Sequence, residues 1–310
     1  MNENSTQTVA TAPLVAHSAA IAAIVDRLGA TTVAVRGRHG SVASGVVWQD
    51  GLVVTAAHVF RRPPASVTLI GAAGTSIDAT LVGVDASTDI AVFRLTGEHG
   101  LVAIVPGDAA TVRAGHFAIA VGRSIEGDLV ASAGMVNRAA GEWQTWLGGS
   151  LDRLIRLDGG VYDGLSGAPV ADASGAVIGI ATSALSRSYG IVVPASTVSR
   201  VVAALLATGH VARPWLGVGA QSVPLPASAG AGAGLLISSL APGGPAERAG
   251  LLIGDIVVRA AGQVATDLRA LRSALAAQVG KSATLSVLRG GAAKELQVEV
   301  GEWPAERHGC

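Results

Sequence analysis

The chain has 310 residues, with 22 basic residues against 22 acidic ones and a formal net charge of zero. This length suffices for more than one domain, and the balanced charge argues against a nucleic-acid-binding surface or a basic membrane-binding patch. Half of the residues are hydrophobic but only 3% are aromatic, so we expect a core of Ala, Val, Ile and Leu. We predict no nucleic-acid partner.

The single cysteine, Cys310, is the last residue, which rules out a disulfide within the chain and argues against cysteine catalysis. The seven histidines show no H-x-x-x-H spacing, and the chain holds no C-x-x-C pair. We therefore predict no metal site and no cofactor.

The N-terminal stretch carries only Glu3 as a charge before Asp26 and lacks the basic residues of a secretory signal. Thr, Ser and His17 dilute its apolar residues, which argues against a stable membrane span. We predict an amphipathic helix over 18–28 and a cytoplasmic protein, with a signal anchor as the alternative. The remaining ends, 1–17 and 303–310, are predicted to be flexible tails.

Short runs of Val, Ile and Leu recur from Thr31 to Ile191 between turns rich in Gly, Asp and Asn. Many short strands without a long helical pattern between them predict an all-β barrel or sandwich. The clearest runs are 31–35, 44–48, 52–57, 67–70, 79–84, 90–95, 116–121 and 175–182.

The hydrophobic period changes after Pro194. Apolar residues between Val198 and Leu206 recur at helical spacing and predict a helix that Gly209 ends, followed by a linker at 210–214. A smaller unit over 215–302 then shows one helical run at 267–279 and a low-complexity loop at 223–234. Its strand-like runs are 215–220, 234–240, 255–260, 283–289 and 294–300.

Ser166 lies in the Gly-rich turn G-L-S-G-A-P, within the stretch LDGGVYDGLSGAPVADASGAVIGIAT (157–182). Apolar strand-like runs lead into and out of this turn. Gly164 can adopt backbone angles that most residues avoid, so that N–H groups can point toward the serine hydroxyl. An accessible hydroxyl beside two N–H donors suits a nucleophile with an oxyanion hole, although a surface β-turn uses the same residue types.

Two further residues complete a catalytic pattern with Ser166. His58 directly follows a buried strand-like run, and Asp89 precedes another. The order His58, Asp89, Ser166 is that of the Ser–His–Asp triad carried on paired β-barrels. Histidine can take the serine proton and return it to a leaving amine, while Asp89 would hold the useful tautomer. Taken alone, His58 could be a core histidine and Asp89 a turn aspartate. Taken together with Ser166, the three residues favour the triad.

The segments TAAHV, DASTDIAV and DGGVYDGLSGAPVADASGAVIGI resemble the three catalytic blocks of HtrA/Deg-type, trypsin-like serine proteases. The blocks VPGDAATVRAGHFAIAVG, SYGIVVPASTVSRVV and ARPWLGV extend this resemblance over residues 18–300. It implies a chymotrypsin-like double β-barrel over 18–209 and a smaller α+β PDZ domain over 215–302. It also implies an ATP-independent serine endopeptidase for protein quality control, which cleaves unfolded or damaged polypeptides through an acyl-enzyme and binds peptide C-termini.

Two positions beside the nucleophile depart from the family pattern. Leu165 stands where the family usually has Asn and digestive trypsins have Asp, and Ala168 replaces a usual glycine. The oxyanion donors implied by the resemblance are the N–H groups of Gly164 and Ser166. Without the acid, trypsin-style activation by a freed N-terminus has no partner, so loop ordering would have to set activity. The alternative is a latent protease that acts as a peptide-binding or chaperone-like scaffold.

Gly160 lies six residues before the nucleophile, where trypsins carry the acid that selects Lys or Arg. Without this carboxylate we expect an apolar specificity pocket and cleavage after small or medium aliphatic residues. The residues expected at this pocket are Gly160, Val161, Ile180, Ala181 and Thr182.

In the PDZ-like unit, the segment WLGV resembles the loop that binds a peptide carboxylate, with the helix from Asp267 as the other wall of the groove. A generic β-turn-β element is the alternative. The peptide-binding residues implied by the resemblance are Trp215, Leu216, Gly217 and Val218.

HtrA-type proteases often form trimers through an N-terminal segment rich in aromatic residues. No Phe, Tyr or Trp precedes Trp48 in this chain, so the resemblance leaves a homo-oligomer open without predicting the trimer. Many relatives are exported, which makes a periplasmic or extracytoplasmic location the alternative to the cytoplasm.

Overall fold

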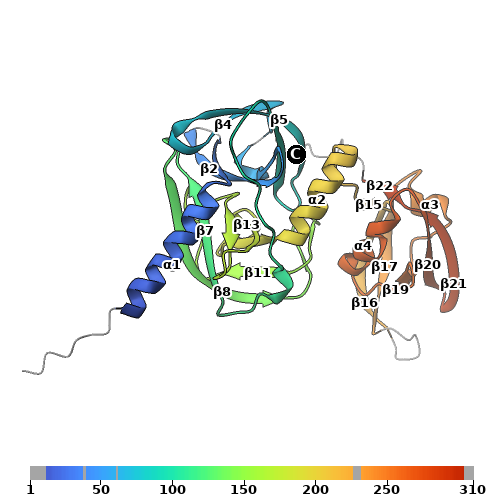
Figure 1. Ribbon diagram of the computed structural model, residues 1–310. Helices are drawn as coiled ribbons and strands as arrows, with labels where there is room; N and C mark the ends of the chain where they lie inside the picture. Colours follow the sequence, from blue (N-terminus) through green and yellow to red (C-terminus); the bar gives the residue numbers. More distant parts are fainter. Residues whose placement is uncertain (1–11, 38–39, 61, 226–231, 304–310) are drawn as a thin grey trace, which may run out of the picture. The chain divides into compact units, whose positions relative to one another are not determined.

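The computed structural model describes residues 12–37, 40–60, 62–225 and 232–303. The chain divides into two compact units, Met1–Val211 and Ala212–Cys310 (Figure 1). The first unit holds two closed six-stranded barrels, and the second holds an open sheet with short helices. The predicted mostly-β fold, a double barrel followed by a smaller unit, is confirmed.

The first barrel is antiparallel throughout and has the strand order β1-β2-β3-β6-β5-β4, with β1 and β4 closing it. All of the strand-like runs between residues 31 and 95 lie in it. Its strands are β1 (Thr32–Arg36), β2 (Val42–Gln49), β3 (Leu52–Ala56), β4 (Ser66–Ile70), β5 (Ser76–Asp85) and β6 (Ile90–Leu95).

The second barrel is also antiparallel and has the order β11-β14-β13-β12-β7-β8. A small hairpin of β9 (Trp143–Gln144) and β10 (Ser150–Leu151) lies between β8 and β11. The barrel strands are β7 (Phe117–Arg123), β8 (Leu129–Ala140), β11 (Leu154–Leu157), β12 (Pro169–Ala171), β13 (Val177–Thr182) and β14 (Ile191–Pro194).

The continuous apolar runs arise because some strands are buried on both faces. In β3, Val53 belongs to the cluster inside the first barrel, whereas Leu52 and Val54 belong to the cluster shared with the second barrel and α2. Since successive side chains of a strand point to opposite faces, both faces must be apolar. The large shared cluster holds the two barrels together.

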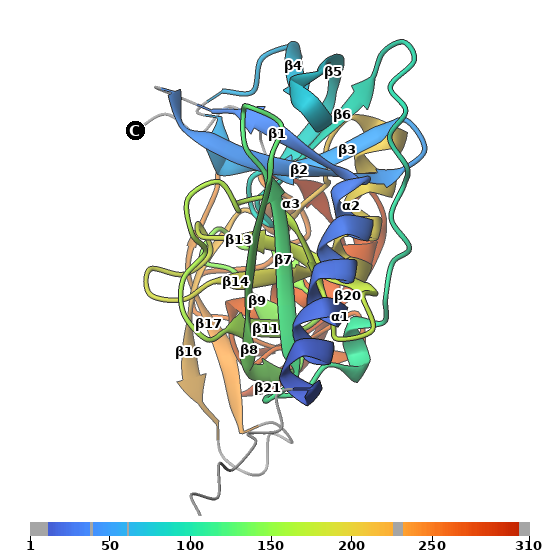
Figure 2. The ribbon, with the colours of Figure 1, turned by 60° about the vertical axis from the view of Figure 1, so that its left-hand side comes forward.

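Two helices cover the barrels. Helix α1 (Ala12–Gly29) begins six residues before the predicted start at 18 and packs against β7 (Figure 2). Helix α2 (Ala195–Thr208) ends at Gly209, which adopts the predicted left-handed capping conformation with φ 76°. None of the described helices is long and apolar enough to cross a membrane.

The second unit is built on a sheet of order β16-β17-β18-β20-β21, with β16 at one edge. The predicted strand 215–220 is interrupted at Gly217, whose φ of 73° breaks the extended backbone. The elements are β15 (Pro214–Trp215), β16 (Val218–Pro224), β17 (Ala233–Leu240), α3 (Pro245–Arg248), β18 (Ile256–Ala260), β19 (Gln263–Val264), α4 (Leu268–Leu275), β20 (Ser282–Arg289), β21 (Ala292–Glu299) and β22 (Gly301–Glu302).

The helix predicted over 267–279 is shorter than expected: α4 begins after its cap Asp267 and passes into a 3₁₀ turn (Ala276–Gln278). The low-complexity stretch predicted as a loop contributes its ends to β16 and β17, and its residues 226–231 lie outside the described part. Of the predicted tails, residues 1–11 and 304–310 lie outside it as well.

Candidate active site

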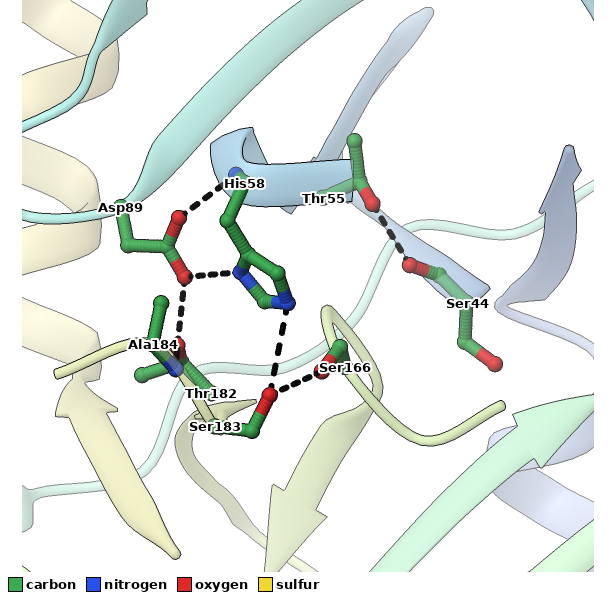
Figure 3. Close-up of polar contacts among 8 residues, drawn as sticks. All are labelled: Ser44, Thr55, His58, Asp89, Ser166, Thr182, Ser183 and Ala184. Atoms are coloured by element: carbon green, nitrogen blue, oxygen red, sulfur yellow. Dashed lines mark hydrogen bonds and ion pairs between the residues drawn. The ribbon is translucent and has the colours of Figure 1, made fainter. Parts of the chain in front are cut away.

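The three candidate catalytic residues come from both barrels. His58 lies in a 3₁₀ turn (Ala57–Val59) directly after β3, and Asp89 lies in the turn that leads into β6. Ser166 lies in the turn between β11 and β12 of the second barrel. His58 and Ser166 line one cleft of about 300 Å³, together with Ser183 from the end of β13 (Figure 3).

Asp89 orients the imidazole ring through two contacts. One carboxylate oxygen, Oδ2, lies 2.7 Å from His58 Nδ1, and the other accepts the backbone N–H of His58 at 2.8 Å. The hydroxyl of Thr182 also donates to Oδ2. Because the Asp89 side chain is only 4% exposed, its charge is shielded from water and favours a proton on Nδ1. Nε2 is then the ring nitrogen that has a lone pair in the cleft.

The turn before Asp89 is held by buried hydrogen bonds. Asp85 accepts from the backbone N–H and hydroxyl of Ser87 and from the hydroxyl of Thr88. Thr145, from the small β9–β10 hairpin, donates its hydroxyl to the carbonyl of Ser87 at 2.7 Å. Asp89 itself has a φ of 61°, which is uncommon for a residue other than glycine. These contacts fix the carboxylate beside the ring.

The nucleophile turn is fastened to the first barrel by Ser44 of β2. The hydroxyl of Ser44 donates to the carbonyl of Gly164 at 2.7 Å, and its N–H donates to the carbonyl of Ser166 at 2.9 Å. Gly167 must be glycine for two reasons. Its φ is 83°, which favours glycine, and a Cβ there would lie 2.2 Å from the backbone carbonyl oxygen of Ser44. The turn is therefore held on both sides of Ser166.

Both amides that were expected to form the oxyanion hole are free of competing protein acceptors. Gly164 has a φ of 87°, and within the described part of the chain neither its N–H nor that of Ser166 donates to a protein group. Two unengaged amides beside a serine hydroxyl can stabilise a negative oxygen. The turn has the groups that acyl transfer requires.

Leu165 anchors this turn by apolar contact. Its side chain is 2% exposed and belongs to the cluster inside the second barrel, with Ala168, Val170 and Ala181 among its neighbours in that cluster. The side chains of that cluster are apolar, so an apolar leucine suits this position.

Ser166 and His58 are connected through a residue that the sequence did not single out. The hydroxyl of Ser166 lies 3.2 Å from that of Ser183, which lies 3.4 Å from His58 Nε2. Ser44 was missed as a contact residue in the same way. The one available signal for Ser183 was its position next to Thr182, a residue expected at the specificity pocket.

The residues expected at the specificity pocket separate into three groups. Gly160, Val161 and Ala181 line a cavity of about 70 Å³ behind the nucleophile turn, and Val161 also lines the cleft. Ile180 faces the cluster shared by the barrels. Thr182 binds the Asp89 carboxylate instead.

The residues expected to bind a peptide carboxylate surround the start of β16. Leu216 is buried and its carbonyl accepts from the Ala246 N–H, while the Gly217 carbonyl accepts from the Ala241 N–H. Trp215 ends β15, and Val218 begins the edge strand β16. An edge strand has backbone groups that an extended peptide can pair with.

Across residues 12–37, 40–60, 62–225 and 232–303, no three His, Cys, Asp or Glu side chains are grouped so as to hold a metal ion. The groups gathered in the cleft are a hydroxyl, an imidazole, a buried carboxylate and backbone amides. This set is suited to nucleophilic catalysis.

Comparison with known proteins gives two matching family models. One, described as a trypsin-like peptidase domain, matches residues 43–180, and the other, described as a PDZ domain, matches residues 236–289. The solved structure of the HtrA-type protease AlgW with decapeptide is 26% identical, with a TM-score of 0.78 over 92% of this chain and 99% of that chain. The chain resembles the HtrA-type proteases and carries the two domains that these models describe.

Curated serine proteases are similar to the chain as well. A probable periplasmic serine endoprotease, DegP-like, of Brucella suis is 34% identical over 285 residues, which are 87% of this chain and 55% of the relative. A putative serine protease HhoB of Synechocystis is 29% identical, covering 86% of this chain and 68% of the relative. The chain thus spans about half the length of the DegP-like relatives that it matches.

The predicted cytoplasmic location is wrong. The DegP-like relatives of this chain, from Brucella suis and from Rhizobium meliloti among others, are named as periplasmic. The prediction depended on the lack of basic residues in the N-terminal stretch. The lack of basic residues gives no positive indication of a cytoplasmic location, so it is a weak basis for that prediction.

Proposed function

We propose that this protein is a serine endopeptidase that works outside the cytoplasm, with Ser166 as nucleophile, His58 as general base and acid, and Asp89 as the residue that orients His58. The observation that carries this proposal is that Ser166 and His58 line one cleft, with the buried Asp89 Oδ2 2.7 Å from His58 Nδ1. The deprotonated Nε2 faces the side of the cleft where Ser166 lies.

The proposed reaction follows from the groups in the cleft. Ser166 Oγ attacks the scissile carbonyl while its proton passes to His58, and the N–H groups of Gly164 and Ser166 hold the oxyanion. Collapse breaks the C–N bond as His58 protonates the leaving amine. Water then hydrolyses the acyl-enzyme by the same proton path. Asp89 stabilises the imidazolium in both steps.

We propose unfolded or damaged polypeptides as substrates, with their C-termini bound at the second unit. This is supported by the PDZ family match and by the edge strand β16, which an extended peptide could join. It is also supported by the solved AlgW structures, whose titles name a bound decapeptide or tripeptide.

Active-site labelling tests the nucleophile. The full chain should react with a fluorophosphonate probe, with or without an apolar C-terminal peptide, and Ser166→Ala should abolish labelling. Casein cleavage by that variant should fall by about 10⁶-fold, as for other triad nucleophiles. Ser188→Ala, on an exposed loop, is the control. A wild-type chain that takes no label under either condition would leave only a peptide-binding scaffold.

We propose that the pocket for the residue before the cleaved bond is small. Gly160, Val161 and Ala181 carry no charge in its cavity of about 70 Å³, and Asp158, Ser132 and Tyr162 supply the polar side chains of the lining. A panel of peptides should be cut after Ala or Val in preference to Phe, Lys or Arg, read as kcat/KM. Val161→Ala should shift the preference toward Leu. Cleavage mainly after Lys or Arg would contradict this assignment.

A further inference from the structure

The hydroxyl of Ser183 lies between the candidate nucleophile and the candidate base. It is 3.2 Å from Ser166 Oγ and 3.4 Å from His58 Nε2, and Figure 3 shows the three groups in sequence. Among the described residues, Ser183 is the one protein group bonded to Nε2. The bonded path from nucleophile to base therefore runs through a second serine.

The direction of the two bonds follows from counting protons. Asp89 beside Nδ1 favours a proton on that nitrogen, so Nε2 has a lone pair and must accept. Ser183 has a single hydroxyl proton, which it donates to Nε2. Its oxygen is then an acceptor toward Ser166, whose hydroxyl donates. The chain Ser166 to Ser183 to His58 is thus oriented for proton transfer toward the imidazole.

Ser183 is held at this point by its neighbours. The hydroxyl of Thr182 donates to the Asp89 carboxylate and accepts the N–H of Ala184 at 3.1 Å. The residues on both sides of Ser183 are thereby tied to the carboxylate that orients His58. Ser183 itself is exposed in the cleft, so its side chain does not serve to fill the core.

We propose that Ser183 is a further catalytic residue whose hydroxyl carries the proton between Ser166 and His58. As Ser166 Oγ forms its bond to the substrate carbon, its proton moves to Ser183 Oγ, and the proton of Ser183 moves to His58 Nε2. The carbonyl electron pair becomes the oxyanion. When the C–N bond breaks, the proton on Nε2 goes to the leaving nitrogen. Ser183 ends each step neutral.

The observed distances leave room for this transfer. The distance from Ser166 to Ser183 exceeds the 2.5–3.0 Å of ordinary O–H···O bonds, and the O–H···N distance from Ser183 to His58 is longer still. Catalytic hydrogen bonds in enzymes without substrate are often long and tighten in the reacting complex. A substrate filling the cleft would exclude water and favour that contraction. This inference rests on the proposed function, because it needs Ser166 to be the nucleophile.

The test compares the full-length wild type with Ser183→Ala, Ser183→Thr and the control Ser188→Ala. Ser183→Ala should lower kcat about tenfold or more, a part of the usual contribution of positioned proton transfer, with KM unchanged. Ser183→Thr, which keeps the hydroxyl, should recover most of the rate. The rate should also be measured in mixtures of H₂O and D₂O. For the wild type, a plot of rate against deuterium fraction should be curved, as expected when two protons move in one step. For Ser183→Ala the same plot should be linear, because only one proton then moves.

The outcomes separate this inference from the proposed function. An active wild type whose Ser183→Ala variant keeps or exceeds the wild-type kcat would overturn the relay, since the hydroxyl would then only compete with Ser166 for Nε2. An inactive wild type that takes no fluorophosphonate label would overturn the proposed function itself. A thermal unfolding curve of Ser183→Ala that overlays the wild type would assign the loss of rate to chemistry.

Discussion

Leu165 stands directly before the candidate nucleophile, and its side chain lies in the interior of the second barrel. At 2% exposure it is among the largest fully buried residues of the chain. The position of Ser166 and of the amides beside it thus depends on an apolar contact. Related proteases usually have Asn at this position. In this chain Leu165 packs in the apolar interior of the second barrel instead.

Leu165→Ala should therefore affect stability and labelling together. Removing a buried leucine costs about 2–5 kcal/mol of unfolding free energy, because it leaves a cavity. The turn that holds the oxyanion amides would also lose its anchor, so the fluorophosphonate labelling rate should fall. Urea unfolding and a labelling time course measure the two effects.

Leu206→Ala is the matched control, since Leu206 is 39% exposed on α2. It should cost less than about 1 kcal/mol, as is usual away from buried features, and leave labelling unchanged. If both leucine variants were equally stable, packing at Leu165 could not be what holds the turn.

Individual residues differ in how far the sequence predicts them. His58, Asp89 and Ser166 could be proposed because each lies in a local motif whose neighbours indicate its role. Ser44 and Ser183 could not, because their roles arise only from contacts across the fold. The Ser44 hydroxyl reaches Gly164, which is 120 positions away along the chain.

Helix α1 is joined to the second barrel through Arg123 of β7, a buried arginine that donates hydrogen bonds to backbone carbonyls. Its guanidinium donates to the carbonyls of Gly29 at the helix end, Thr32 and Gly127. Burial lowers the pKa of Arg123 from its usual value, although the side chain remains charged at neutral pH. One side chain thus connects the helix, β1 and the β7–β8 turn.

Arg123→Met should weaken this junction by leaving three carbonyls without their donor. At about 1 kcal/mol for each hydrogen bond, the loss should approach 3 kcal/mol. Arg27→Met is the control, because Arg27 makes a single exposed bond from the same helix to Ser174. Urea unfolding should show a large shift for the first variant and a small one for the second. Equal shifts would contradict the role of Arg123.

Elements were predictable where their apolar pattern was strong. Strands β3 and β6 are buried over most of their length and consist mainly of apolar residues. Strand β8 was not predicted, because its residues are mostly exposed and include Ala, Ser, Gly and Asn. Its position is set by pairing with β7 and β11, which a local pattern does not contain.

For the molecule as a whole, acid stability should differ between the two units. In the second unit, Asp255 is 2% exposed and accepts two hydrogen bonds from Arg289, at 2.8 and 2.7 Å. The hydrogen bonds from Arg289 lower the pKa of Asp255 below its ordinary value, and the N–H of Leu252 acts in the same direction. The carboxylate therefore stabilises the folded unit.

The sign of the pH effect follows from this depressed pKa. The stabilisation is fully present above the unfolded pKa of about 3.9 and is lost as the pH falls through the lower folded value. The protection of peptides from 233–300 against hydrogen exchange in the full chain, corrected for the intrinsic exchange rate at each pH, should fall below about pH 4. Asp255→Asn should lower this protection at pH 7 and flatten its acid dependence, whereas Glu295→Gln, exposed on the same sheet, should do neither. An unchanged acid dependence in Asp255→Asn would contradict the assignment.

The hydrogen bonds of Ser44 make the geometry of the cleft depend on how the two barrels pack together. This residue belongs to one barrel, yet its hydroxyl and its amide both hold the nucleophile turn of the other, and the hydroxyl also accepts from the Arg123 N–H. A small sliding motion of one barrel over the other would disturb the oxyanion amides while every strand stayed paired. We therefore expect the proposed activity to be lost on heating or under pressure before either barrel unfolds, so that paired strands alone would not indicate an active cleft.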